Sequence, residues 1–488
     1  MAKGAHVSAQ SKWLDRYFKI SKRGSTIGQE MRGGVVTFLT MAYIIVLNPL
    51  ILGFVKDSTG HYLGGGLEPN LAAIAAGTSL VAGIMTLLMG AVANYPLALA
   101  TGLGLNAFVA FSIATRSTWE AAMGLVVIEG ILILILVLTG LRQAIFRAVP
   151  HQLKTAISVG IGLFITFIAF VDAGFVHRIP DAANTTVPVQ LGATGSLDGL
   201  PIVVFVVGLL LIIALWIHRV KAAILIGIAA ATILALVLEA IFHVGAVGAA
   251  NPLGWGLNVP VIPGDLFSVP NFATLGHFDL VGAFTSMGIL AAILLIISLL
   301  VSDFFDTVGT MTAIGAEGNL LDKDGNPPNT KEILIVDSVA AAAGGMAGVS
   351  SNTSYIESAA GVGEGARTGL ASIVTGVLFL LSIFLAPLVR IVPSEAAVPA
   401  LVLVGFLMMR QLSDIKWRDN DIAIPAALTI LAMPFTYSIS VGIGVGFISY
   451  VFIKLIRGKA KSVHPLLWGA SMLFVIYFAM APLQRLFG

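Results

Sequence analysis

The sequence contains no cysteine, and only 11% of its 488 residues are charged. The absence of cysteine excludes disulfides, thiol catalysis and thiolate metal sites. The shortage of charge excludes an ordinary soluble domain, because 57% of the residues are hydrophobic and the mean hydropathy is +0.97. This composition is typical of a polytopic membrane protein.

Motifs that would indicate other functions are also absent. The sequence has no paired-histidine metal motif, GxSxG elbow or phosphate loop, so we expect neither an enzyme nor a bound cofactor or metal. The string GLGLNAF lacks the strand–helix context of a nucleotide fingerprint. The net charge is +2, with basic residues in short loops, so nucleic-acid binding is not expected.

Apolar segments of membrane-spanning length recur along the whole chain. With roughly 20 residues needed for each helical span, the chain has room for about fourteen crossings. The predicted segments are 33–55, 70–92, 95–115, 119–141, 154–175, 200–217, 221–242, 281–302, 333–349, 352–366, 367–389, 394–411, 421–436 and 438–457. The sequence therefore predicts an all-α membrane protein without a sizeable soluble domain.

The distribution of Lys and Arg predicts the orientation of these segments. Residues 1–32 are basic and show no cleavable signal, which places the N-terminus in the cytoplasm. The connection 243–280 contains no Lys or Arg and is expected outside. Seven spans before this loop put the second half in inverted topology, as in many secondary transporters. Whether 463–486 crosses the membrane or lies at the interface is left open.

The third and tenth segments are poor continuous helices. Each opens with residues that favour an extended backbone, Tyr95–Thr101 and Ser350–Tyr355. We expect two short strands followed by half-helices, an arrangement that marks binding sites in transporters. Gly104 would allow close backbone approach to a flat substrate, and the amide of Asn106 offers a donor and an acceptor. Packing alone also explains glycine in such helices.

Four acids lie in or beside apolar runs, where a carboxylate is expensive to bury. Asp303 and Asp306 share one helical face; the alternative is that both cap the cytoplasmic end of a span in water. Glu357 lies where the second half-helix would begin, with no basic residue before Arg367. Glu129 interrupts the run VVIEGILIL and is either a proton relay or a structural partner.

Other acids are expected to be structural. Glu364 and Arg367 are three residues apart and predict an ion pair near the cytoplasm. Glu239 lies close to the end of a span, which favours a structural role.

Four strings together resemble one transporter family. EMRGGVVTFLTMAYIIVLNP, ATGLGLNAFVAF, SDFFDTVGTMTAIG and NTSYIESAAGVGEGARTGLASIVTG are similar to the AzgA-like purine permeases of the nucleobase:cation symporter-2 superfamily. The resemblance extends from about Ser21 to Phe478. It implies a seven-plus-seven inverted repeat with two discontinuous spans that carry short β-strands.

The resemblance also implies a division into a core domain and a gate domain. After a cytoplasmic segment 1–32, the expected parts are core 33–141, gate 142–242, an external loop 243–280, core 281–390, gate 391–457 and a C-terminal hydrophobic segment 458–488.

Carried over to this chain, the family pattern implies that Asp306 and Glu357 bind the base. Gly104 and Asn106 match the third-span positions, and Ser358 and Thr310 complete the expected substrate-binding set. Thr310 replaces the His or Asp of uracil and xanthine permeases, which favours adenine, guanine or hypoxanthine.

The expected function is import of purine bases by proton symport, through an elevator or rocking motion of core against gate. The proton carrier is left open among Asp306, Glu357, Glu129 and Asp303. The alternatives are an anion transporter of the same fold or a xanthine or uracil permease. The expected location is the plasma or inner membrane, with lipid and purine as partners; a homodimer through gate contacts, as in relatives, is also left open.

Overall fold

The computed structural model describes residues 9–140, 149–179, 189–193, 195–248, 251–262, 269–323 and 326–487. Within these ranges, ten helical segments are long and apolar enough to cross a membrane. They are Ile27–Gly53, Leu71–Ala93, Trp119–Leu138, His151–Asp172, Leu200–Ile217, Ala223–Phe242, Ile289–Glu317, Gly369–Ile391, Ser394–Asp414 and Ile439–Ile456. Shorter apolar segments are Leu103–Arg116, Asn420–Thr436 and Pro465–Ala479. The chain is a multi-pass membrane protein; fourteen crossings stay a prediction.

The secondary structure is almost entirely helical. The first half contains α1 (Ala9–Phe18), α2 (Ile27–Met41), α3 (Ile44–Gly53), α4 (Leu71–Leu88), α5 (Leu103–Ala107), α6 (Trp119–Leu138), α8 (His151–Asp172), α9 (Leu200–Ile217) and α10 (Ala223–Phe242). The second half contains α11 (Gly282–Ser286), α12 (Ile289–Glu317), α13 (Thr330–Met346), α14 (Ser358–Gly363), α15 (Gly369–Ser382), α16 (Ser394–Ala397), α17 (Pro399–Met409), α18 (Asn420–Thr436), α19 (Ile439–Ile456) and α20 (Pro465–Phe487). The strands are β1 (Leu99–Thr101), β2 (Val176–Arg178), β3 (Val189–Leu191) and β4 (Asn352–Ser354).

Side-chain caps fix where several of these helices begin. Thr26 accepts a hydrogen bond from the backbone of Gln29 at the start of α2, and Thr118 does the same for Ala121 at the start of α6. Such caps satisfy backbone donors that the first helical turn leaves unpaired. These local hydrogen bonds determine where each helix begins, and the apolar residues that follow determine how deeply the helix is buried.

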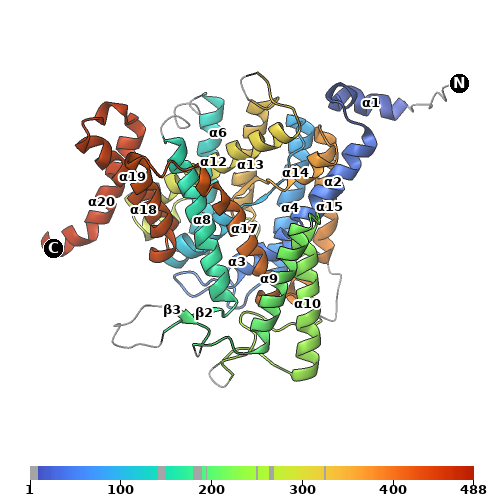
Figure 1. The fold of residues 1–488 in the computed structure, drawn as a ribbon, viewed down its shortest axis with the longest axis horizontal. Coiled ribbons are helices and arrows are strands. Elements are labelled where there is room, and N and C mark those ends of the chain that lie inside the picture. Colours follow the sequence, from blue (N-terminus) through green and yellow to red (C-terminus); the bar gives the residue numbers. More distant parts are fainter. Residues whose placement is uncertain are drawn as a thin grey trace.

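The two halves pack around each other in matching pairs. The second segment of the chain, α4, packs on the eleventh, α15, and the fourth, α6, packs on the ninth, α13. Exchanging the halves converts one pair into the other, as an inverted repeat requires. A second group of helices packs together, in which α8 contacts both α17 and α18. In Figure 1, α18, α19 and α20 lie at one end of the molecule and α1 at the other.

The predicted interruptions of the third and tenth segments are present. β1 pairs with β4 in antiparallel register, with Leu99 opposite Ser354 and Thr101 opposite Asn352. β1 leads into α5, and β4 is followed by α14 after three residues. The strands satisfy each other's backbone groups, which irregular backbone within a membrane requires.

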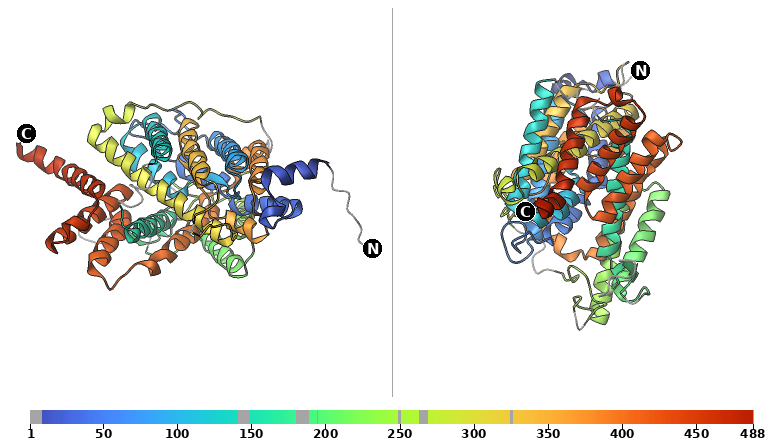
Figure 2. Two further views of the ribbon diagram at one scale, coloured as in Figure 1. Left: turned by 90° about the horizontal axis from the view of Figure 1, so that it is seen from above. Right: turned by 90° about the vertical axis from the view of Figure 1, so that its left-hand side faces the viewer.

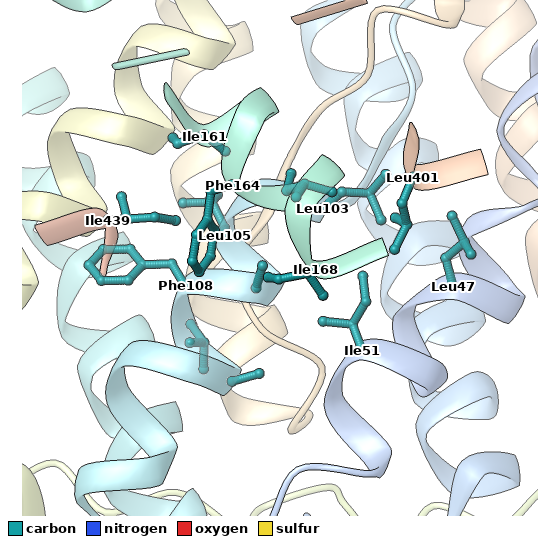
Figure 3. Close-up of a cluster of buried hydrophobic side chains, with 14 of the residues drawn as sticks. Leu47, Ile51, Leu103, Leu105, Phe108, Ile161, Phe164, Ile168, Leu401 and Ile439 are labelled. Atoms are coloured by element: carbon teal, nitrogen blue, oxygen red, sulfur yellow. The ribbon is translucent and has the colours of Figure 1, made fainter. Parts of the chain in front are cut away.

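The half-helix α5 packs against α8 through an apolar contact. Figure 3 shows Leu103, Leu105 and Phe108 beside Phe164 and Ile168 of α8, all within one buried hydrophobic cluster. The contact is apolar and contains no ion pair among the described residues.

Two helices extend beyond the apolar segments predicted from the sequence. α12 continues past Ser302 to Glu317, and α2 begins at Ile27, before the predicted segment 33–55. Asp303 lies in the interior of α12 and is fully buried. Neighbouring hydroxyl groups donate hydrogen bonds to the buried carboxyl group and so reduce the cost of its burial. A count of apolar residues does not detect such partners.

Candidate functional site

Hydrogen bonds hold the two interrupted segments in a fixed crossing. The backbone N–H of Ala98 donates to Ser358 Oγ (3.0 Å), and that of Tyr355 donates to the carbonyl of Ala98 (3.0 Å). On the other side of the strands, the N–H of Gly102 donates to the carbonyl of Ser351 (3.1 Å). The crossing is therefore a rigid platform for the side chains that project from it.

Two carboxyl groups next to this platform are accessible. Glu357 precedes α14, is partly exposed and accepts a hydrogen bond from the Tyr43 hydroxyl. Asp306 on α12 is exposed and lies within electrostatic range of Glu357. The structure thus brings together the two acids that the family pattern assigns to the base.

Three further acids are buried next to β4. They are Glu129 on α6, Asp303 on α12 and Asp337 on α13. Ser351 Oγ lies 3.1 Å from Asp303 Oδ2 and 3.4 Å from Glu129 Oε2. The carboxyl groups of Glu129 and Asp303 therefore converge on one hydroxyl group. We call Glu129, Asp303 and Asp337 the buried acid cluster.

Hydroxyl groups hold the third member of this cluster. Asp337 accepts hydrogen bonds from Thr307 Oγ1 (2.8 Å) and Ser354 Oγ (2.9 Å). Thr307 Oγ1 also lies 2.8 Å from Thr353 Oγ1 of β4. The buried acid cluster is therefore connected through the hydroxyls of α12 and β4, next to the helix that carries Asp306.

No basic side chain within the described ranges forms an ion pair with any of these five acids. The ion pairs there involve only Glu364 and Asp421. Burying an unpaired charge is costly. The arrangement is consistent with carboxyl groups that bind protons or polar ligands.

Two amide side chains complete the platform. Asn106 Nδ2 donates to Thr101 Oγ1 (3.1 Å), while Asn106 Oδ1 has no partner among the described residues. Asn352 is buried, and neither its Oδ1 nor its Nδ2 has a partner there. Because side chains alternate along a strand, Asn352 lies on the face opposite Ser351 and Thr353.

The remaining predicted residues lie close by in different settings. Thr310 is buried on α12, one turn beyond Asp306. Gly104 contacts α8, where an added Cβ would lie 2.6 Å from Ile161 Cγ2. The oxygen of Ser358 is occupied by the Ala98 N–H described above.

The expected pair between Glu364 and Arg367 is wrong. Glu364 forms ion pairs with Arg32 of α2 and with Lys221, in the turn between α9 and α10. Arg367 instead donates to the carbonyls of Val362 and Ala366. The carbonyl of Val362 lies in the last turn of α14, where helices leave such groups without a partner in the helix.

Sequence reasoning missed Asp337 and Tyr43. Asp337 lies in the apolar run ILIVDSVAAAAGG, so the signal that identified Glu129 could have found it. Tyr43 is one of three aromatic residues in the predicted first segment, 33–55, and only the fold shows that it contacts Glu357.

Comparison with known proteins shows extensive similarity. The profile of the permease family that includes xanthine and uracil permeases matches residues 28–445. The chain is 36% identical to the guanine/hypoxanthine permease PbuG of Bacillus subtilis (strain 168), over 95% of this chain and 99% of that protein. It is 35% identical to the adenine permease AdeP of Escherichia coli (strain K12), over 95% of each.

Solved structures show the same fold at low sequence identity. SLC26A9 aligns with a TM-score of 0.59 at 14% identity, covering 91% of this chain and 67% of that one. The transmembrane domain of the cyanobacterial bicarbonate transporter BicA aligns with a TM-score of 0.53 at 16% identity, covering 86% and 96%. The predicted inverted-repeat fold and the family resemblance are both confirmed.

Proposed function

Because the chain belongs to the nucleobase:cation symporter-2 family of permeases, we propose that it imports the purine bases hypoxanthine, guanine or adenine. The observation that carries this proposal is the pair of accessible carboxyl groups, Asp306 and Glu357, beside the crossing strands. Relatives that the chain matches over nearly their full length are guanine/hypoxanthine and adenine permeases.

The residue types suit the edge of a purine. A carboxylate accepts hydrogen bonds only, so Asp306 and Glu357 can receive ring N–H and exocyclic amino protons. The amides of Asn106 and Asn352 can donate to the ring nitrogens and carbonyl groups of the base. Tyr43 orients Glu357 through its hydroxyl, which leaves the second carboxylate oxygen for the substrate.

Proton coupling is proposed for the buried acid cluster together with Asp306 and Glu357. Glu129 and Asp303 converge on the hydroxyl of Ser351, which has only one proton to donate, so a proton on either acid would relieve the cost of burying two carboxylates together. Thr307 and Ser351 connect this cluster to the strand that leads to Glu357. A proton held there would reduce the net charge that must move with the base. No cofactor takes part in this scheme.

The transport motion is proposed to be a displacement of core against gate. The core would comprise α2 to α6 and α12 to α15, with the strands, and the gate α8 to α10 and α16 to α19. The apolar contact of α5 with α8 in Figure 3 supports this division, since interfaces without hydrogen bonds slide at low cost. The basic segment before α2 supports a cytoplasmic N-terminus.

An anion transporter is the competing function, because the chain shares its fold with an anion-transporting family. The accessible acids disfavour this alternative, since an anion next to Asp306 and Glu357 would be repelled. No basic residue in the described ranges pairs with either acid.

Equilibrium binding to the purified protein tests the proposal. Radiolabelled hypoxanthine, guanine and adenine should bind saturably, and unlabelled purines should displace them better than uracil, xanthine, bicarbonate or chloride. Asn106→Ala should weaken binding by about five- to tenfold, the value of one hydrogen bond. Binding of bicarbonate or chloride with no binding of any base would reject the proposal.

A further inference from the structure

A cavity of about 300 Å³ lies away from the crossing strands, where α19 gives way to α20. Its polar lining is formed by Tyr450, Lys461, Ser462 and His464. Pro150, Val463, Pro465 and Leu467 supply the apolar part. This volume is at the lower end of small-molecule binding sites and accommodates a phosphate-bearing headgroup.

The surroundings of this cavity are positively charged. Lys454, Arg457 and Lys459 all form ion pairs with a single carboxylate, Asp421. Lys461 is exposed and forms no ion pair with any described residue. No acid lines the cavity, but Asp421 and Asp419 both act electrostatically on Tyr450. The four cations therefore face two carboxylates, and the local excess favours an anion.

Exposed apolar side chains lie on the two helices that the cavity adjoins. Phe452, Leu455 and Ile456 on α19 are more than half exposed, as are Leu466 and Met472 on α20. In Figure 2, the C-terminal end of α20 projects beyond the neighbouring helices. An occupant with both a negative headgroup and apolar chains would therefore satisfy the cations and cover these side chains.

We propose that this cavity binds the headgroup of an anionic phospholipid, with Lys461 and His464 contacting the phosphate and the acyl chains lying along α19 and α20. Tyr450 supplies a hydroxyl donor to the same group, while the Ser462 hydroxyl donates to the carbonyl of Lys459. The bound lipid would hold α20 against the end of α19. Basic pockets between membrane helices bind acidic headgroups in this way.

Thermal unfolding of the full chain in a neutral detergent tests this assignment. The probes are dioctanoyl phosphatidylglycerol, dioctanoyl phosphatidylcholine and inorganic phosphate, each titrated separately. Phosphatidylglycerol should stabilise the protein saturably, and the other two should not. Lys461→Gln should weaken its apparent affinity about fivefold, as expected for one lysine at a lipid headgroup, and adding His464→Asn should weaken it further.

The matched control is Lys416→Gln, an exposed lysine outside the cavity, which should behave like the unsubstituted protein. Base binding in each variant shows whether it is folded. Equal stabilisation by phosphatidylcholine would overturn the proposal. So would equal stabilisation by inorganic phosphate, which would assign the cavity to a free anion, or an unchanged affinity in the double variant.

Discussion

The hydroxyl of Tyr43, in the first apolar segment, donates a hydrogen bond to the carboxylate of Glu357, which precedes the half-helix α14. This contact joins residues 314 positions apart and places Glu357 beside the crossing strands. Tyr43 is buried, so its hydroxyl fixes the orientation of the carboxylate without occupying the accessible side.

Removing this hydroxyl should weaken base binding while leaving the protein folded. We expect Tyr43→Phe to raise the Kd for the preferred purine about five- to tenfold, the value of one ordinary hydrogen bond, because the variant loses the orientation of Glu357 but keeps its carboxylate. Equilibrium binding measures the change. Tyr17→Phe is the control, because Tyr17 is exposed, its hydroxyl donates to the carbonyl of Ala91, and its ring contacts with Trp13 and Phe18 are kept in the variant. An unchanged Kd in Tyr43→Phe would mean that Glu357 needs no orienting partner.

The buried acid cluster should determine how uptake depends on the proton gradient. We expect Asp337→Asn to abolish the acceleration of uptake by an inward pH gradient, because it removes an acid linked by Thr307 and Ser354 to the strand. Uptake into proteoliposomes with and without the gradient measures this. Glu332→Gln, in the first turn of the same helix, should retain the acceleration. Gradient-driven uptake at normal rate in Asp337→Asn would remove Asp337 from the proton path.

Glu364 connects the two proposed domains through its ion pair with Lys221. The pair is partly exposed, so we expect it to stabilise this conformation by only about 0.5–1 kcal/mol.

Because the chain has no cysteine, Ile356→Cys, at an exposed position next to Glu357, introduces a unique thiol. Adding Lys221→Gln should slow its labelling by about two- to fivefold. Lys331→Gln, which removes a lysine of α13, should not change the rate. Faster labelling would show that the ion pair instead stabilises a conformation in which residue 356 is less accessible.

Asp57 should stabilise the connection between α3 and α4 at neutral pH. Burial raises the pKa of its carboxyl, but hydrogen bonds from Thr59, His61 and Trp119 outweigh this and hold the pKa below 3.8. A lowered pKa gives a stabilisation that is present above the unfolded-state value and lost as pH falls through the folded-state value.

We therefore expect Asp57→Asn to lower the free energy of unfolding by about 1–2 kcal/mol, equally at pH 7 and pH 5. Thermal unfolding at the two pH values measures this. Glu68→Gln, an exposed acid in the same connection, should have little effect. A loss seen at pH 7 that disappears at pH 5 would contradict the lowered pKa.

The sequence predicted the elements that depend on local composition. The interrupted third and tenth segments were identified from Pro96 and from the hydroxyl-rich stretch at Ser350, and the structure contains strands there. Inverted topology followed from the distribution of Lys and Arg together with the number of spans.

The contacts that the sequence did not predict involve polar side chains with distant partners. The apolar segment of the eighth span ends at Ser302 because two acids follow it, and the hydroxyls that satisfy buried carboxylates, those of Ser351 at Asp303 and Thr307 at Asp337, are identified only by the fold. The partners of Glu364 also lie far along the chain, at Arg32 and Lys221. Such contacts depend on tertiary packing, which a single sequence does not reveal.

The most direct measurement is uptake of radiolabelled hypoxanthine, guanine and adenine into proteoliposomes, with and without an inward pH gradient, for the unsubstituted protein and Glu357→Gln. We expect accumulation of at least one purine under the gradient. In the variant it should fall by about ten- to 150-fold, because a charged hydrogen-bond acceptor for the base is lost. Accumulation at an unchanged rate in Glu357→Gln, or no accumulation of any purine by the unsubstituted protein, would contradict a purine symporter with its site at Glu357.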